Sequence, residues 1–259
     1  MADISRRAVI KATGAVGAAM LPVGLAINEA PAQEHRHTAA TEDNVPAPPP
    51  AGSQAQPTPY LFFNAEEAAF IEAAVARLIP ADDKWGGARE AGVPNYIDKQ
   101  LNGAWGAGER LYRSGPWQAG TPSQGYQLPF TPAELFRTAL AAINAELKDK
   151  TPFANMSASE QDAYLHSLEA GGKDLGGIPS NVFFNDLWEA TVEGFFSDPV
   201  YGGNRDMLAW RMIGFPGAYA SYYDLVDQHG IAVARAPTSL AEDVHGHVHM
   251  DAAIPANLP

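Results

Sequence analysis

Two carboxylates, Glu193 and Asp198, lie five residues apart in the segment of this 259-residue chain that is densest in candidate functional groups. Such a pair could supply the general acid and the general base of a hydrolase. A structural interpretation fits the same residues, with Asp198 capping or turning the chain before Pro199 and Gly202-Gly203 forming a tight turn. The sequence alone leaves both interpretations open.

Three histidines near the C-terminus, His245, His247 and His249, alternate along the chain. On an extended strand their imidazoles would share one face and could bind zinc or copper. The alternative is a solvated tail whose imidazoles have no fixed geometry and no supporting hydrogen bonds. A metal-binding protein is therefore one hypothesis for the chain, although no residue is assigned to a metal.

The chain offers no motif for holding a cofactor of its own. It contains no cysteine, which excludes thiolate nucleophiles, iron–sulfur clusters and covalently attached c-type haem. It also has neither the glycine motif of dinucleotide-binding folds nor a P-loop. A net charge of −13 argues against a nucleic-acid partner and against direct docking on an anionic membrane. We therefore expect no catalytic residue and no cofactor in this chain.

The first 32 residues have the features of a bacterial export signal. Arg6 and Arg7 stand in the twin-arginine pattern Ser-Arg-Arg-x-x-x-Lys, an apolar run covers residues 12–27, and small residues follow at 30–32. The run is shorter than the roughly 20 residues of a membrane span. The twin-arginine translocase exports proteins that are already folded, often after a cofactor has been inserted. Since this chain has no cofactor motif, we hypothesise that the cofactor belongs to a partner.

Hydrophobic periods and capping residues predict an all-α fold, because apolar side chains recur every three to four residues and alternating patterns are scarce. We expect a compact irregular helical bundle with long loops rich in glycine, proline and aromatic residues. The expected helices run from the cap Asn64 to just before Pro80, and over 93–101, 131–148, 157–168 and 180–196, with shorter helical pieces at 204–212 and 217–226.

Composition divides the chain into an export signal (1–32), a proline-rich linker (33–59), a helical domain (60–235) and a tail that contains histidine (236–259). We expect the linker and the tail to be extended or disordered, because such segments bury too little apolar surface to offset the entropy lost on ordering.

Aromatic residues in irregular, glycine-rich parts of the helical domain form a candidate partner interface. The segment 103–129 follows neither the helical nor the strand period, and loops of this length are usually functional or packed on another surface. Amphipathic aromatic side chains are enriched at protein interfaces. The candidate interface residues are Trp105, Trp117, Tyr126, Tyr201 and Phe215.

Several segments together resemble one family. They are 78–82, 92–98, 115–117, 124–128, and the block 193–204 followed by Trp210 and 213–217. In combination they are similar to the small subunit of gluconate 2-dehydrogenase, also called subunit 3 or the gamma subunit. The resemblance extends from Tyr60 to about Asp227.

This resemblance implies a non-catalytic role in a periplasmic, membrane-associated dehydrogenase. In such a heterotrimer a large FAD-containing subunit oxidises a sugar or sugar acid, and a multihaem cytochrome c subunit passes the electrons to ubiquinone. The small subunit is expected to carry the export signal for the folded flavoprotein, to stabilise it as a chaperone, and to meet the inner membrane only through the complex. The resemblance supplies no catalytic residues to place on this sequence.

Overall fold

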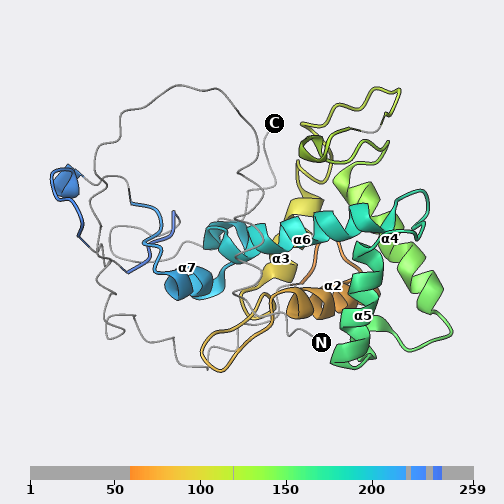
Figure 1. The fold of residues 1–259 in the computed structure, drawn as a ribbon, viewed down its shortest axis with the longest axis horizontal. Helices are drawn as coiled ribbons and strands as arrows, with labels where there is room; N and C mark the ends of the chain where they lie inside the picture. The colour runs from red at the N-terminus through yellow and green to blue at the C-terminus, as the bar shows by residue number, and fades with distance from the viewer. Residues whose placement is uncertain (1–58, 119, 220–222, 232–235, 241–259) are drawn as a thin grey trace, which may run out of the picture. The chain divides into compact units, whose positions relative to one another are not determined.

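The computed structural model describes residues 59–118, 120–219, 223–231 and 236–240. These residues form α-helices joined by loops and short 3-10 turns, and they contain no β-strand (Figure 1). The all-α prediction is therefore confirmed. The α-helices are α2 (Ala65–Leu78), α3 (Val93–Asn102), α4 (Pro132–Leu147), α5 (Ala158–Glu169), α6 (Ser180–Phe196) and α7 (Leu208–Ile213).

Capping residues begin three of these helices where the sequence predicts. The side chains of Asn64, Thr131 and Ser157 each accept a hydrogen bond from the backbone N–H three residues later. The glutamate at that later position accepts one in return from the capping residue's own N–H. Each box satisfies two backbone donors that the first helical turn leaves without partners.

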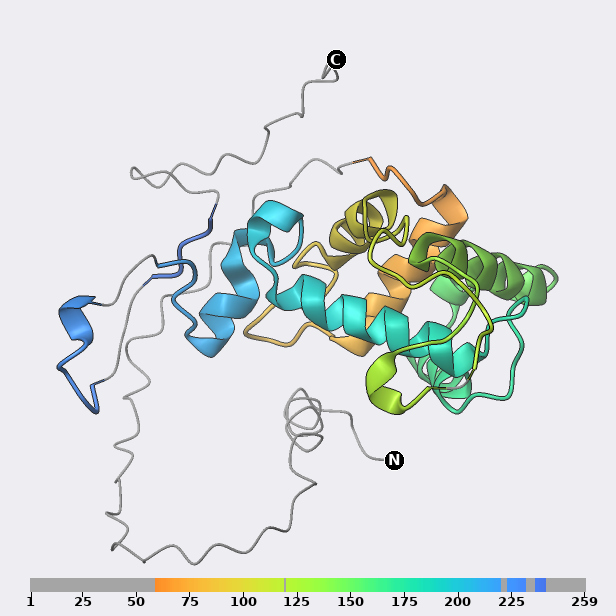
Figure 2. The ribbon, with the colours of Figure 1, turned by 90° about the horizontal axis from the view of Figure 1, so that it is seen from above.

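Helix α6 lies at the centre of the bundle and packs against α2, α3, α4, α5 and α7 (Figures 1 and 2). Its fully buried Phe183 contacts Phe70 of α2 and Phe136 of α4, with ring centroids 6.3 and 5.4 Å apart. Burial of such rings is the main favourable contribution to the folding of a domain of this kind. None of the helices in the described ranges is long and apolar enough to cross a membrane.

The chain turns sharply after α6, as Gly202-Gly203 predicts. Gly202 follows the 3-10 turn Pro199–Tyr201 with φ of 99°. A Cβ on Gly203 would lie 2.1 Å from the carbonyl oxygen of Gly194 in α6. Only glycine allows this close approach of the two backbones.

The two predicted short helical pieces need correction. In the first, Arg205–Met207 forms a 3-10 turn with left-handed residues, and the α-helix begins only at Leu208. In the second, residues 217–219 are not helical, because Gly217 has φ of 78° and forms a bridge with Thr238. The following Tyr223–Leu225 forms a single 3-10 turn. The bridge partner is distant in sequence, so local periodicity could not reveal it.

Candidate partner-binding surface

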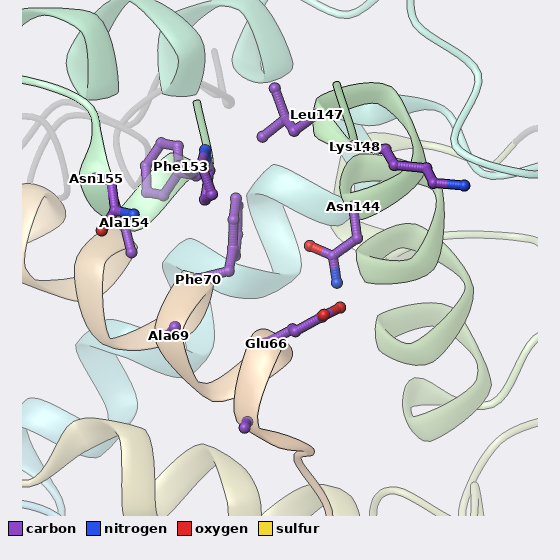
Figure 3. A pocket seen from close by; sticks show the side chains of 11 residues that line it. Glu66, Ala69, Phe70, Asn144, Leu147, Lys148, Phe153, Ala154 and Asn155 are labelled. Atoms are coloured by element: carbon purple, nitrogen blue, oxygen red, sulfur yellow. The ribbon is translucent and has the colours of Figure 1, made fainter. Parts of the chain in front are cut away.

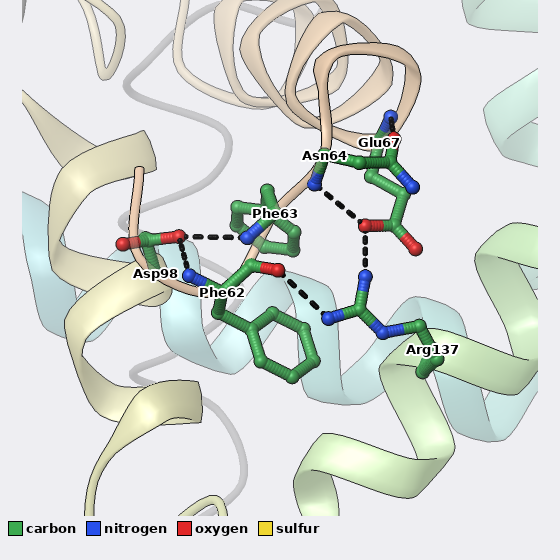
Figure 4. A network of polar contacts seen from close by, with 6 residues as sticks. All are labelled: Phe62, Phe63, Asn64, Glu67, Asp98 and Arg137. Atoms are coloured by element: carbon green, nitrogen blue, oxygen red, sulfur yellow. Dashed lines mark hydrogen bonds and ion pairs between the residues drawn. The ribbon is translucent and has the colours of Figure 1, made fainter. Parts of the chain in front are cut away.

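A buried carboxylate holds the segment through which the chain enters the domain. Asp98 of α3 is only 2% exposed. Its Oδ1 accepts hydrogen bonds from the backbone N–H groups of Phe62 and Phe63, both at 2.9 Å, and its Oδ2 accepts one from Leu61 at 2.7 Å (Figure 4). A charged group buried in this way is tolerated because each oxygen has a donor.

A second clamp on the same segment comes from α4. Arg137 donates from Nη2 to the carbonyl oxygen of Phe62 at 2.7 Å, and its guanidinium lies 4.0 Å from the centre of the Phe62 ring. Its Nη1 pairs with the buried carboxylate of Glu67, which also accepts from the N–H of Asn64 (Figure 4). The sequence identified Asn64 and Glu67 as a capping pair but missed Asp98 and Arg137, since both act across long stretches of chain.

Asp198, the candidate general base, performs a similar structural role at the other end of the domain. It is 8% exposed. Its Oδ1 accepts from the backbone N–H of Val200 at 3.0 Å and from the hydroxyl of Ser239 at 2.6 Å. Its Oδ2 accepts from the N–H of Leu240 at 2.8 Å. Three donors thus engage the carboxylate, which favours the capping interpretation over catalysis.

Glu193, the other candidate carboxylate, is exposed on α6 and has different partners. Its Oε2 accepts a hydrogen bond from the hydroxyl of Tyr96 at 3.5 Å. Partial burial and the nearby carboxylate of Glu189 raise the pKa of Glu193. The structure therefore gives Glu193 and Asp198 separate surroundings.

The candidate interface residues of the loop between α3 and α4 differ in exposure. Trp105 is 42% exposed, whereas Trp117 and Tyr126 are half-buried. The Tyr126 hydroxyl donates to the carbonyl oxygen of Phe130 at 3.0 Å, and burial together with the charge of Asp186 raises the Tyr126 pKa. Tyr126 thus serves mainly to hold the loop.

The other two candidate interface residues, Tyr201 and Phe215, are exposed and follow α6 and α7 respectively. Phe215 packs edge-on against Trp210 with ring centroids 5.2 Å apart. The Trp210 indole donates to the carbonyl oxygen of Phe196 at 2.9 Å, which fixes the ring beneath Phe215. The structure also exposes large apolar residues that sequence reasoning did not select, namely Leu111, Tyr112, Val200, Ile213 and Leu240.

One carboxylate stands out as buried without a full set of partners. Asp186 of α6 has a buried Oδ2 that finds no hydrogen-bond partner among the described residues. Burial, with a smaller contribution from Glu189, raises the pKa of Asp186 to about 7. Nothing in its local sequence distinguishes it from the exposed acidic residues of the same helix.

A hollow of about 430 Å³ lies between the start of α2, the end of α4 and the turn at 152–155 (Figure 3). Phe70 and Phe153 form its floor, with ring centroids 4.6 Å apart. Glu66 and Asn144 face each other across it, while Lys148 extends away. Its 11 lining residues, all of them described, include no serine, cysteine or histidine, so it lacks the pairs of nucleophile and imidazole that catalyse acyl transfer.

Other predicted site residues cannot be placed. Arg6, Arg7, His245, His247 and His249 lie outside the described residues. Within the part that the structure describes, no three histidine or acidic side chains come together as metal ligands would. The metal hypothesis for the three histidines therefore stays a prediction.

A helical domain with aromatic side chains on its surface and firmly held chain ends has the character of a protein-binding module. A family model described as gluconate 2-dehydrogenase subunit 3 matches residues 65–217, more than half of the chain. The chain belongs to this family, which confirms the resemblance and makes it a subunit of a gluconate dehydrogenase complex. No curated protein and no solved structure match it.

Proposed function

We propose that this chain is the non-catalytic small subunit of a periplasmic FAD-dependent dehydrogenase, and that it escorts the folded flavoprotein through the twin-arginine route and stabilises it. The observation that carries the proposal is membership of the gluconate 2-dehydrogenase subunit 3 family. The twin arginines at positions 6 and 7 support the escort role, because a folded partner can be exported together with the chain that bears the signal.

The redox chemistry belongs, in this proposal, to the partners. A large subunit would hold FAD and oxidise a sugar or sugar acid, gluconate being the first candidate, and a multihaem cytochrome c would receive the electrons at the inner membrane. Without cysteine this chain has no residue for covalent haem attachment, and it lacks a dinucleotide-binding glycine motif. We therefore assign both cofactors to the partner subunits.

The escort role is tested by replacing the twin arginines. Arg6→Lys combined with Arg7→Lys, introduced beside an unchanged flavoprotein gene, should leave the flavin-containing subunit in the cytoplasm, because the translocase reads the paired guanidinium groups. The matched control is Arg36→Lys in the linker, which should leave export normal. Immunoblots and flavin content of the periplasmic fraction give the measurement. Normal arrival of the flavoprotein in the double variant would show that it has another route.

A further inference from the structure

Exposed apolar side chains gather where the chain folds back at the C-terminal end of the domain. Val200, Tyr201, Ile213, Phe215 and Leu240 are each between 40% and 67% exposed. We call these five residues the C-terminal surface. It lies beside the end of α6 and includes the last residue of α7, two helices that pack together (Figure 2).

Hydrogen bonds bring the separate segments of this surface together. The carboxylate of Asp198 joins the N–H groups of Val200 and Leu240. A short pairing follows, in which the N–H of Thr238 donates to Pro216 at 3.1 Å and that of Ala218 donates to Thr238 at 2.7 Å. The C-terminal surface is thus formed before any partner arrives, which lowers the entropy cost of binding.

Gly217 makes this crossing of two backbones possible. Its φ of 78° lies in the left-handed region, and a Cβ at this position would stand 2.2 Å from the carbonyl oxygen of Thr238. The conformation is available to glycine and strained for other residues. A fold that uses such a position to hold the segment before Ser239 and Leu240 has a specific arrangement of these residues at its surface.

The chain between the paired segments adds further apolar area. It leaves after Tyr219, whose hydroxyl donates to the carbonyl oxygen of Ala236 at 2.9 Å, and its described part exposes Tyr223 (87%), Val226 and Ile231. With the C-terminal surface these side chains expose about 900 Å² in total, at typical side-chain areas. Monomeric proteins rarely expose more than a few hundred Å² in one apolar patch, whereas one side of a stable interface buries roughly 800 Å².

Charge favours a different protein as the occupant over a second copy. The whole chain carries −13, so two copies repel each other. Residues 199–219 contain only Arg205, Asp206 and Arg211 as charged residues, and interface cores are depleted of charge. Around Trp105 and Tyr112 charges are denser, with three among residues 103–114.

We propose that the C-terminal surface, extended by residues 223–231, binds the flavin-containing subunit of the dehydrogenase through an apolar face of that partner. The proposal rests on the proposed function. It makes Asp198 and Gly217 positioning residues for the interface, and it places the main contact at Tyr201 and Phe215 rather than at Trp105 and Trp117.

The test compares two matched double variants of the full chain, each produced together with the flavin-containing subunit. Tyr201→Ser with Phe215→Ser should weaken binding at least tenfold, because aromatic anchors dominate interface energies. Trp105→Ser with Tyr112→Ser, which removes two aromatic rings from the other exposed group, should bind within about twofold of the wild type. The readouts are the FAD that purifies per tagged chain and the Kd by calorimetry.

A folding control separates loss of binding from loss of structure. Phe215 packs on Trp210, so circular dichroism and thermal unfolding must accompany the first variant. Ile213→Ser with Leu240→Ser provides a second C-terminal surface variant and should weaken binding by about the same factor, since both side chains are exposed.

Each outcome has a separate meaning. If the wild-type chain brings no FAD-containing subunit with it, the proposed function itself fails. If the wild type binds and both folded C-terminal surface variants bind equally well, this inference is overturned while the proposed function stands. A wild-type homodimer in sedimentation that the same variants dissociate would assign the surface to a second copy and also overturn the inference.

Discussion

Buried aspartates perform two different tasks in this domain. Asp98 and Asp198 each accept three hydrogen bonds and thereby hold a distant segment in place. Asp186 is buried with one oxygen lacking a partner among the described residues. A carboxylate in such surroundings favours its protonated form, which is why the Asp186 pKa rises to about 7.

The raised pKa of Asp186 predicts a specific dependence of stability on pH. The folded protein keeps a proton that the unfolded chain releases near pH 4. The stability that this group contributes is therefore fully present below about pH 4 and is lost as pH rises through 7. Asp186→Asn cannot ionise, so it should exceed the wild type in unfolding free energy by about 1–3 kcal/mol at pH 8, and the gain should vanish near pH 4.

Denaturant unfolding at several pH values between 4 and 8 measures this difference. The matched control is Asp149→Asn, at an exposed position, which should change stability by less than about 0.5 kcal/mol across the range. Glu189→Gln should give a smaller gain than Asp186→Asn, because Glu189 is the lesser cause of the shift. A gain in Asp186→Asn that does not depend on pH would contradict the explanation.

Helices in this chain begin at local signals that act independently of the rest of the fold. Thr131 caps α4, accepts from the N–H of Glu134 at 3.2 Å, and precedes Pro132 at the first helical position. A hydroxyl cap and an N-terminal proline both favour helix initiation, whatever surface the helix later buries. Each predicted cap was accordingly found in place.

Loss of this cap should destabilise the domain by a modest and measurable amount. Thr131→Ala removes the acceptor for the Glu134 N–H and should lower the unfolding free energy by about 1 kcal/mol. Thr151→Ala, at an exposed position outside any helix, should cost less than about 0.5 kcal/mol. Equal midpoints for the two variants in urea would show that the capping bonds contribute nothing to stability.

At the scale of the whole molecule, the entry segment belongs to the folded domain. Leu61, Phe62 and Phe63 connect the chain to α3 through Asp98 and to α4 through Arg137 (Figure 4). Their removal would leave two buried charged side chains without their donors and acceptors, which is costly in a low-dielectric interior.

Two truncated chains measure this contribution. A chain that begins at Pro59 should keep the thermal midpoint of a full-length control, because the entry segment is intact. A chain that begins at Ala65 should lose at least about 3 kcal/mol of stability, since Asp98 and Arg137 remain buried in part while their partners are gone. Identical midpoints by calorimetry would show that residues 60–64 only rest on the surface.

The sequence determined the helical content, the start of each major helix and the family, because capping boxes and apolar periods operate over a few residues. It also supplied the export signal, which stays a prediction. Only the tertiary structure decided which aromatic residues are exposed and which carboxylates hold distant segments. Asp98 meets a backbone 36 residues away and Asp198 meets a hydroxyl 41 residues away. Burial and such contacts depend on the packing of segments remote in sequence, so no local pattern encodes them.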